Sequence, residues 1–204
     1  MARTARVVSL LFLIGISCPG RTAHLDPKAE AVVERTRTTR ATYVVYGWRS
    51  MDGSSGDWAA EFNSGALHRV ENSINRIVAD CSKMTGAAYD LATGEIDRGA
   101  WTAKAACGIQ SLTTSLSSKW LGQVETPFGR GDRILITDAV SARTYDVLDN
   151  GVIAASTYHR NSDGRDIVME ASDVSNSLPK ADIFSESSLQ ESVVPDRYKQ
   201  SPTH

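Results

Sequence analysis

Histidine and cysteine are the residues of this sequence whose chemistry and spacing could build a catalytic or metal site. There are four histidines, of which His24 and His204 lie in terminal segments. His68 and His159 fall on segments that we expect to be strands, far apart in the chain and without a His-x-x-x-His pattern. We predict that both are surface or edge residues rather than ligands. Since the Gly-x-Ser-x-Gly motif of serine hydrolases is also missing, the sequence predicts no catalytic constellation, no metal and no other cofactor.

The three cysteines, Cys18, Cys81 and Cys107, favour a structural bond over catalysis or metal binding. Two cysteines without an adjacent histidine cannot complete a tetrahedral zinc site, and a redox-active pair would normally be a Cys-x-x-Cys. In an oxidising compartment an even pair is typical of a disulfide. We therefore predict a bridge between Cys81 and Cys107, which would stabilise the fold by about 3 kcal/mol through the entropy of the closed loop.

Residues 1–23 have the layout of a secretory signal peptide. Arg3 and Arg6 make a positively charged start, residues 7–16 are uncharged and apolar, and small or turn-forming residues follow. A membrane-spanning helix needs about 20 apolar residues, so this apolar segment is too short to cross a bilayer. The alternative is a buried N-terminal helix or strand. We predict export, to the periplasm of a Gram-negative-type bacterium.

Cys18 lies at the edge of that signal and leaves two routes open. Cleavage after Gly20 or Ala23 would remove it and leave an even number of cysteines in the mature chain. Alternatively, Cys18 becomes the lipidated first residue of a bacterial lipoprotein, for which residues 15–17 are a partial lipobox. The first route predicts a released protein, and the second predicts one anchored to a membrane at its N-terminus.

The charge of the mature chain limits its partners. The whole sequence has 22 lysines and arginines against 24 acidic residues. Removal of residues 1–23 takes away three arginines and no acid, which leaves 19 basic against 24 acidic residues and a net charge of −5. Nucleic acids and anionic lipid headgroups both need a basic face, so we expect no nucleic-acid partner. No later stretch is long and apolar enough for a transmembrane segment.

The elements that would position a site follow from the periodicity of the sequence. Asp26 as N-cap and Pro27 as first helical residue predict a helix over 27–38. Apolar residues at spacings of three or four predict a helical segment over 101–122. Beyond Phe184 the chain becomes rich in Ser, Glu and Pro, which predicts a tail that packs weakly or is disordered. Short β-branched and aromatic segments predict strands at 41–50, 58–62, 66–72, 75–81, 86–93, 132–139, 142–150, 152–160 and 165–174.

Strands this close in sequence predict an antiparallel meander, because parallel strands need crossovers of a dozen or more residues. The order helix, meander, helical segment, meander predicts one α+β domain in which a curved antiparallel sheet is covered by helices. We expect a signal peptide over 1–23, a single folded domain over 24–184 and a polar C-terminal tail over 185–204.

Aromatic and aliphatic side chains on the predicted sheet and helical segment are the candidates for a ligand site. Ordinary core packing is one interpretation of them. The other is that the curved sheet and its helices leave an apolar pocket between them, which is a common form of binding site. The candidate lining residues are Tyr43, Val45, Trp48, Trp58, Leu67, Val70, Ile77, Tyr89, Trp101 and Trp120.

Two stretches together resemble the LolA-like family of periplasmic lipoprotein and lipid carriers. Residues 65–96 resemble that family's strand run, with an IVAD strand, a turn, and a YD…TGE strand and turn. Residues 143–184 resemble its C-terminal meander and close on the run NSLPKADIF. The Arg-Pro that often follows the family's early strand is absent, with Phe62 and Asn63 near that place. The resemblance implies an unclosed β-barrel lidded by helices, whose apolar cavity takes acyl chains.

The sequence thus supports three functional hypotheses. The first is a non-catalytic periplasmic carrier or binding protein for lipid, acyl chains or lipoproteins. The second is an envelope structural or regulatory module that binds a protein partner through a sheet edge or an apolar face. The third is a secreted enzyme, for which His68 and His159 would be the acid–base candidates.

Overall fold

A computed structural model of the chain describes residues 24–51, 56–109, 117–179 and 182–200. The predicted signal peptide and Cys18 lie outside these residues, so the choice between cleavage and lipidation stays a prediction. The domain boundaries that we predict at residues 23 and 184 likewise stay predictions.

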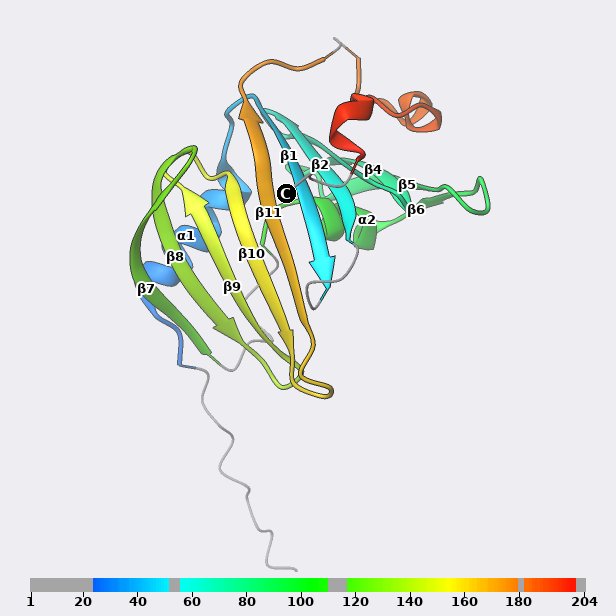
Figure 1. Cartoon of the computed structure of the whole chain (residues 1–204). Coiled ribbons are helices and arrows are strands. Elements are labelled where there is room, and N and C mark those ends of the chain that lie inside the picture. The colour runs from blue at the N-terminus through cyan, green and yellow to red at the C-terminus, as the bar shows by residue number, and fades with distance from the viewer. Residues whose placement is uncertain (1–23, 52–55, 110–116, 180–181, 201–204) are drawn as a thin grey trace, which may run out of the picture.

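Eleven strands within the described ranges form one antiparallel sheet, in the order β6-β5-β4-β3-β2-β1-β11-β10-β9-β8-β7. The two meanders join where β1 pairs with β11, and β6 and β7 are left at the two ends, so the sheet curves without closing (Figure 1). The predicted fold class, an α+β unclosed β-barrel covered by helices, is confirmed. The strands are β1 (Tyr43–Met51), β2 (Asp57–Ser64), β3 (Leu67–Asn72), β4 (Asn75–Asp80), β5 (Thr85–Asp90), β6 (Ile96–Arg98), β7 (Ser117–Thr126), β8 (Gly129–Thr137), β9 (Ser141–Leu148), β10 (Ile153–Arg160) and β11 (Asp166–Ser175).

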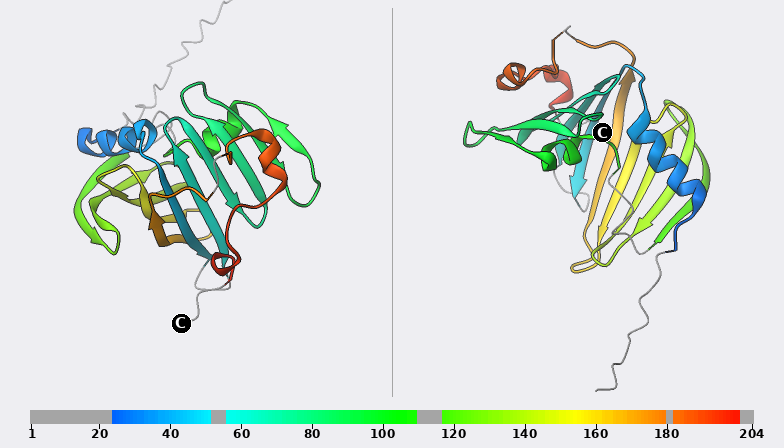
Figure 2. Two further views of the ribbon diagram at one scale, coloured as in Figure 1. Left: turned by 90° about the horizontal axis from the view of Figure 1, so that it is seen from above. Right: turned by 180° about the vertical axis from the view of Figure 1, so that it is seen from behind.

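Helix α1 (Pro27–Thr38) begins and ends as predicted. The Asp26 side chain accepts a hydrogen bond from the backbone N–H of Lys28 at 2.9 Å, and Pro27 fills the first turn, where its missing N–H costs nothing. The helix lies across β7 and β8 (Figure 2) and buries its apolar side against them. The buried cluster that results consists of Ala29, Val32, Val33, Ile109, Ile134, Ile136 and Val147.

The predicted helical segment over 101–122 is only partly correct. Helix α2 (Ala100–Ala106) ends early, and residues from Ser117 onward form the edge strand β7. Two glycines explain the difference, because Gly108 (φ 68°) and Gly122 (φ 124°) adopt left-handed backbone conformations that an α-helix does not contain. Of the apolar residues whose spacing suggested one helix, Ala103 and Ala106 lie in α2 and Trp120 lies in β7, and the part of the predicted helix over 110–116 lies outside the described residues.

The two faces of the sheet are covered by different parts of the chain. Antiparallel register aligns Ile77, Val70 and Glu61 on one face of β4, β3 and β2, and α2 packs on this face through Ile77. Following the register across β1 and β11 shows that Ile134, beneath α1, lies on the same face. We term this the helix face. The opposite face of β1–β5 carries residues 182–200, which we term the C-terminal strap (Figure 2).

The C-terminal strap is packed, in contrast to the weakly packed tail that its composition predicts. Ile183 and Leu189 are fully buried and Val194 nearly so. The ring of Tyr198 stacks on that of Tyr46, with centroids 3.8 Å apart. The composition misled because a few well-spaced apolar side chains suffice to hold a polar segment when a sheet offers them an apolar face.

The predicted disulfide between Cys81 and Cys107 is present, with Cα atoms 5.5 Å apart. It joins the turn after β4 to the residue that caps the end of α2. The bridge therefore fixes a short helix that buries only Thr102, Ala103 and Ala106 from its own length.

Candidate functional site

The ten predicted ligand residues are not brought together in one place. Successive side chains of a strand point to opposite faces of its sheet, so residues from the same strands divide between two surfaces. The helix face carries Tyr43, Val45, Val70, Ile77 and Trp120, the opposite face carries Trp48, Trp58, Leu67 and Tyr89, and Trp101 lies on α2.

The candidates on the helix face have packing partners within the fold. Tyr43 and Val45 lie in a buried cluster with the start of β10 and the end of β9. Ile77 packs beneath α2, with Val70 partly buried beside it. Trp120 packs against the α1 cluster, and its indole N–H donates to Asp132 at 2.9 Å. These side chains stabilise the attachment of both helices to the sheet.

The candidates on the opposite face differ in how closely the C-terminal strap covers them. Trp58 packs against the cluster that the C-terminal strap covers, and the ammonium group of Lys199 lies 5.9 Å from its ring centroid. Tyr89 packs against the cluster around Leu189. Leu67 is different, because 40% of it is exposed although it stands next to buried strand residues.

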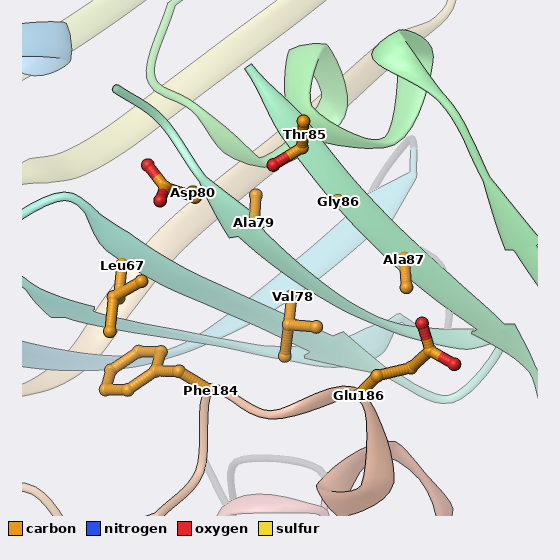
Figure 3. Close-up of a pocket in the computed structure, with 9 residues that line it drawn as sticks. All are labelled: Leu67, Val78, Ala79, Asp80, Thr85, Gly86, Ala87, Phe184 and Glu186. Atoms are coloured by element: carbon orange, nitrogen blue, oxygen red, sulfur yellow. The ribbon is translucent and has the colours of Figure 1, made fainter. Parts of the chain in front are cut away.

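Leu67 opens onto a groove of about 300 Å³ between the sheet and the C-terminal strap (Figure 3). Figure 3 shows Leu67 beside Phe184 at one side and Glu186 near Ala87 at the other, with Val78 between them. The strands thus supply an apolar floor, and the strap supplies one wall. The groove is lined by Leu67, Val78, Ala79, Asp80, Thr85, Gly86, Ala87, Phe184 and Glu186.

Arg69 holds the strap wall of this groove in place. Its side chain is fully buried, and it donates hydrogen bonds of 2.7 to 3.2 Å to the carbonyl oxygens of Ile183, Ser188 and Glu191 and to the Ser188 hydroxyl. Three of these four acceptors are backbone groups. The position of the strap therefore depends on its backbone path as much as on its side chains.

Glu71 supplies the charge that a buried arginine needs. It is also fully buried and accepts a hydrogen bond from Nε of Arg69 at 2.7 Å. It further accepts from the Ser192 hydroxyl at 2.8 Å and from the backbone N–H of Val193 at 3.1 Å. This pair was not predicted from the sequence. The available signal was two opposite charges at positions i and i+2 of a strand, which must lie on the same face.

The rim of the groove is charged but locally neutral. Lys83 lies 2.7 Å from Asp80, and Arg98 donates to Glu186 at 2.9 Å. Hydrogen bonds from Lys83 and Ser82 hold the pKa of Asp80 well below its usual range, and the bond from Arg98 lowers the pKa of Glu186. Both carboxylates are therefore ionised at neutral pH and paired, so the groove suits an apolar group flanked by polar ones.

His68 and His159 lie in different environments. His159 is exposed, as predicted, and pairs with Asp166 at 2.7 Å. His68 is not the surface or edge residue that we predicted, because only 4% of it is exposed. It lies on the helix face beneath the end of α2, where Tyr43 and Glu61 are its neighbours. Glu61 was not among the predicted site residues, although a glutamate within the apolar run WAAEF was a signal for a buried polar contact.

The Tyr43–Glu61–His68 cluster anchors α2. Nε2 of His68 lies 2.7 Å from a Glu61 oxygen, and Nδ1 faces the carbonyl oxygen of Ala106. Both ring nitrogens thus face oxygen acceptors, one on β2 and one at the C-terminal end of α2. Burial alone would raise the pKa of Glu61, but the charge of His68 and hydrogen bonds from His68 and Tyr43 hold it below its ordinary value of 4.5.

This cluster predicts a stability that is lost in acid. Because the pKa of Glu61 is lower in the folded chain than in the unfolded chain, its contribution is present above pH 4.5 and is lost as the pH falls further. We expect Glu61→Gln to lower the free energy of unfolding at pH 7 by about 1–3 kcal/mol. Below pH 4.5 the free energies of unfolding of the variant and the wild type should become equal. Urea denaturation between pH 3 and pH 7 measures this.

The matched control for that experiment is Glu125→Gln, which changes an exposed carboxylate on β7. Its free energy of unfolding should equal that of the wild type at every pH. A gap between Glu61→Gln and the wild type that stays constant down to pH 3 would contradict the assignment.

The fold and the groove together define a class of protein: an unclosed, helix-covered β half-barrel with an amphipathic groove beneath its C-terminal strap. No family model and no curated protein sequence matches the chain. Solved structures, however, do share its architecture.

Two solved structures resemble this chain to a similar degree. An uncharacterized conserved protein from Thermus thermophilus is 11% identical, with 81% of this chain and 94% of that chain covered and a TM-score of 0.54. MucB is also 11% identical, with 82% of this chain and 64% of that chain covered and a TM-score of 0.51. The MucA/MucB complex from Pseudomonas aeruginosa gives the same identity and TM-score. This chain thus spans less than two thirds of the MucB chain, and at 11% identity the likeness shows the fold alone.

Structures from the family that the sequence resembles are also among the neighbours. A putative outer membrane lipoprotein-sorting protein domain from Vibrio parahaemolyticus is 7% identical over 80% of this chain and 97% of that chain, with a TM-score of 0.41. A LolA superfamily protein from Nitrosomonas europaea is 8% identical over 78% and 98%, with a TM-score of 0.37. TM-scores this low do not support a conclusion about function.

Proposed function

We propose that this chain is an exported, non-catalytic binding module of the cell envelope, which holds a segment of a partner protein in the groove of Figure 3. The observation that carries the proposal is the groove itself. Leu67 and Phe184 lie at one side of an apolar floor, and paired charges line the rim. Apolar groups left open beside polar ones are typical of interaction sites. MucB, which shares the fold, has been solved in complex with MucA, and this supports a protein as the ligand.

Export rests on two independent features. Residues 1–23 have the layout of a signal peptide. The disulfide between Cys81 and Cys107 is typical of proteins that leave the reducing cytosol. In the described ranges no helix is both long enough and apolar enough to cross a membrane. The proposal includes either release or a lipid anchor at Cys18.

An acyl chain is the second candidate ligand. The apolar side chains of Leu67, Val78 and Phe184 favour it, and so does the resemblance to lipoprotein carriers. The groove volume of about 300 Å³ lies at the lower end of the range for ligand pockets, which is about 300–1,000 Å³. A groove of this size suits one or two side chains of a peptide better than the several chains of a lipoprotein.

The proposal includes no catalytic step. The cluster that contains the acid–base candidate His68 is made up of Tyr43, Glu61 and His68, which bond to one another and to the end of α2. A general base must reach the proton that it removes from a substrate. His68 is buried and has both ring nitrogens against acceptors, so its role is structural.

Photo-crosslinking from position 67 tests the proposal. We expect p-benzoylphenylalanine in place of Leu67 to yield one discrete protein adduct in cells that export the full chain. The matched control carries the same group in place of Val140, which is 64% exposed but lies between β8 and β9, away from the strap. That control should yield no such adduct.

The alternatives give different results in the same experiment. Adducts whose added mass is that of a lipid would favour the acyl-chain candidate. Equal labelling from positions 67 and 140 would mean that the groove is ordinary surface, and the proposal would then be wrong.

A further inference from the structure

A second pocket, of about 390 Å³, lies on the helix face beside α2. Register places four of its five strand residues, Asn75, Ala88, Asp90 and Asp97, on that face, opposite the groove of Figure 3, whereas the fifth, Ile96, alternates to the other face. The two sites share no lining residue. The pocket is lined by Asn75, Ala88, Asp90, Thr93, Glu95, Ile96, Asp97 and Trp101.

Trp101 gives this pocket an aromatic wall. Half of the residue is exposed, which is unusual for the largest apolar side chain. Its indole N–H donates to Asp97 at 3.2 Å, one helical turn away in sequence. Because that bond holds the edge of the ring, the ring is oriented while a face stays available to a ligand.

The remaining polar groups give the pocket a negative charge. Asp90, Glu95 and Asp97 line it, and none of its eight lining residues is basic. The backbone N–H groups of Thr93 and Ala92 lower the pKa of Asp90, so this carboxylate is ionised at neutral pH. The groove of Figure 3 differs in this respect, since each of its rim carboxylates has a cationic partner.

We infer that this pocket binds the guanidinium or ammonium group of an arginine or lysine side chain on a polypeptide partner. The face of a tryptophan attracts a cation, and carboxylates accept strong hydrogen bonds from its N–H groups. Among the described residues no cluster of His, Cys, Asp and Glu is arranged to hold a metal ion. A choline headgroup fits less well, because it has no N–H to donate and its phosphate would be repelled.

The inference is independent of the groove and of what the groove binds. It is tested with the ¹⁵N-labelled full chain and two matched probes, N-acetylarginine amide and its neutral analogue N-acetylcitrulline amide. The chain has four tryptophans, and Trp101→Phe identifies which indole signal belongs to position 101. We expect the arginine probe to shift that signal in a saturable way and the citrulline probe to leave it in place. Added salt should weaken the response, because it screens exposed charges.

Charge-neutral variants locate the binding. Asp97→Asn keeps an oxygen acceptor for the indole N–H, so it removes the charge without releasing the ring. We expect it, and separately Glu95→Gln, to weaken binding of the arginine probe about threefold to tenfold. Glu125→Gln removes an equally exposed charge on β7, outside the pocket, and should leave the affinity unchanged.

Three results would overturn the inference. They are no shift of the Trp101 signal with the arginine probe, equal shifts with both probes, and a response to phosphocholine but not to arginine, which would indicate a lipid headgroup instead. None of these bears on crosslinking from position 67, so the failure of one proposal can be told apart from the failure of the other.

Discussion

Replacing Arg69 with methionine is expected to lower the free energy of unfolding by about 3–5 kcal/mol, because the buried Glu71 loses its hydrogen-bonded cation and keeps Arg76, at 3.6 Å, as its remaining charged partner. The change also removes four hydrogen bonds to the C-terminal strap. We expect the strap to become accessible to proteases before the rest of the chain unfolds. Urea denaturation at pH 7 and limited proteolysis measure the two effects.

The double variant Arg69→Met with Glu71→Leu is the control for this prediction. It removes both charges and fills their space with apolar groups, so it should recover part of the stability that Arg69→Met loses. The strap should remain looser than in the wild type, since its carbonyl oxygens would still lack their donors. A loss below about 1 kcal/mol for Arg69→Met would mean that the pair does not hold the strap.

Removing the disulfide is expected to have the second largest effect. Cys81→Ala with Cys107→Ala opens a loop of 26 residues, and loop entropy predicts a loss of about 3 kcal/mol. Because the bridge holds the end of α2, hydrogen exchange of the α2 amides should accelerate more than that of β8 and β9, which pair on the far side of the sheet. Denaturation and exchange experiments on the same samples test both statements.

A reducing agent provides the control, because the reduced wild type should lose about the same stability as the double variant. If the unreduced, denatured wild type shows two free thiols at positions 81 and 107, the bridge does not form in the protein. If the bridge forms but its loss changes only global stability, then α2 is held mainly by the contact between His68 and Ala106.

Much of the fold could be predicted because its elements are specified locally. The helix over 27–38 has its cap and first-turn proline within three residues of chain. Every strand that we predicted matches a strand of the sheet, since β-branched segments between tight turns have few other conformations. The disulfide could be predicted by counting, because only two of the three cysteines lie beyond the predicted signal peptide.

The rest depended on partners distant in sequence. The edge strand β7 forms because β8 pairs with it, and the spacing of its apolar residues alone had suggested a helix. The strap is ordered because a buried arginine more than a hundred residues earlier binds its carbonyl oxygens. His68 is buried because the end of α2 lies over it.

The candidate site, like the fold, could be predicted only in part. The sequence alone determined which side chains alternate along each strand, that two cysteines lie beyond residue 23, and that residues 24–204 carry a net acidic charge. Only the tertiary structure decided which alternating set faces the helices and which faces the strap. Only it placed Leu67 in an open groove and Trp101 in an acidic pocket. The physical reason is that alternation is a property of one strand, whereas exposure depends on which distant segment covers the face that the strand presents.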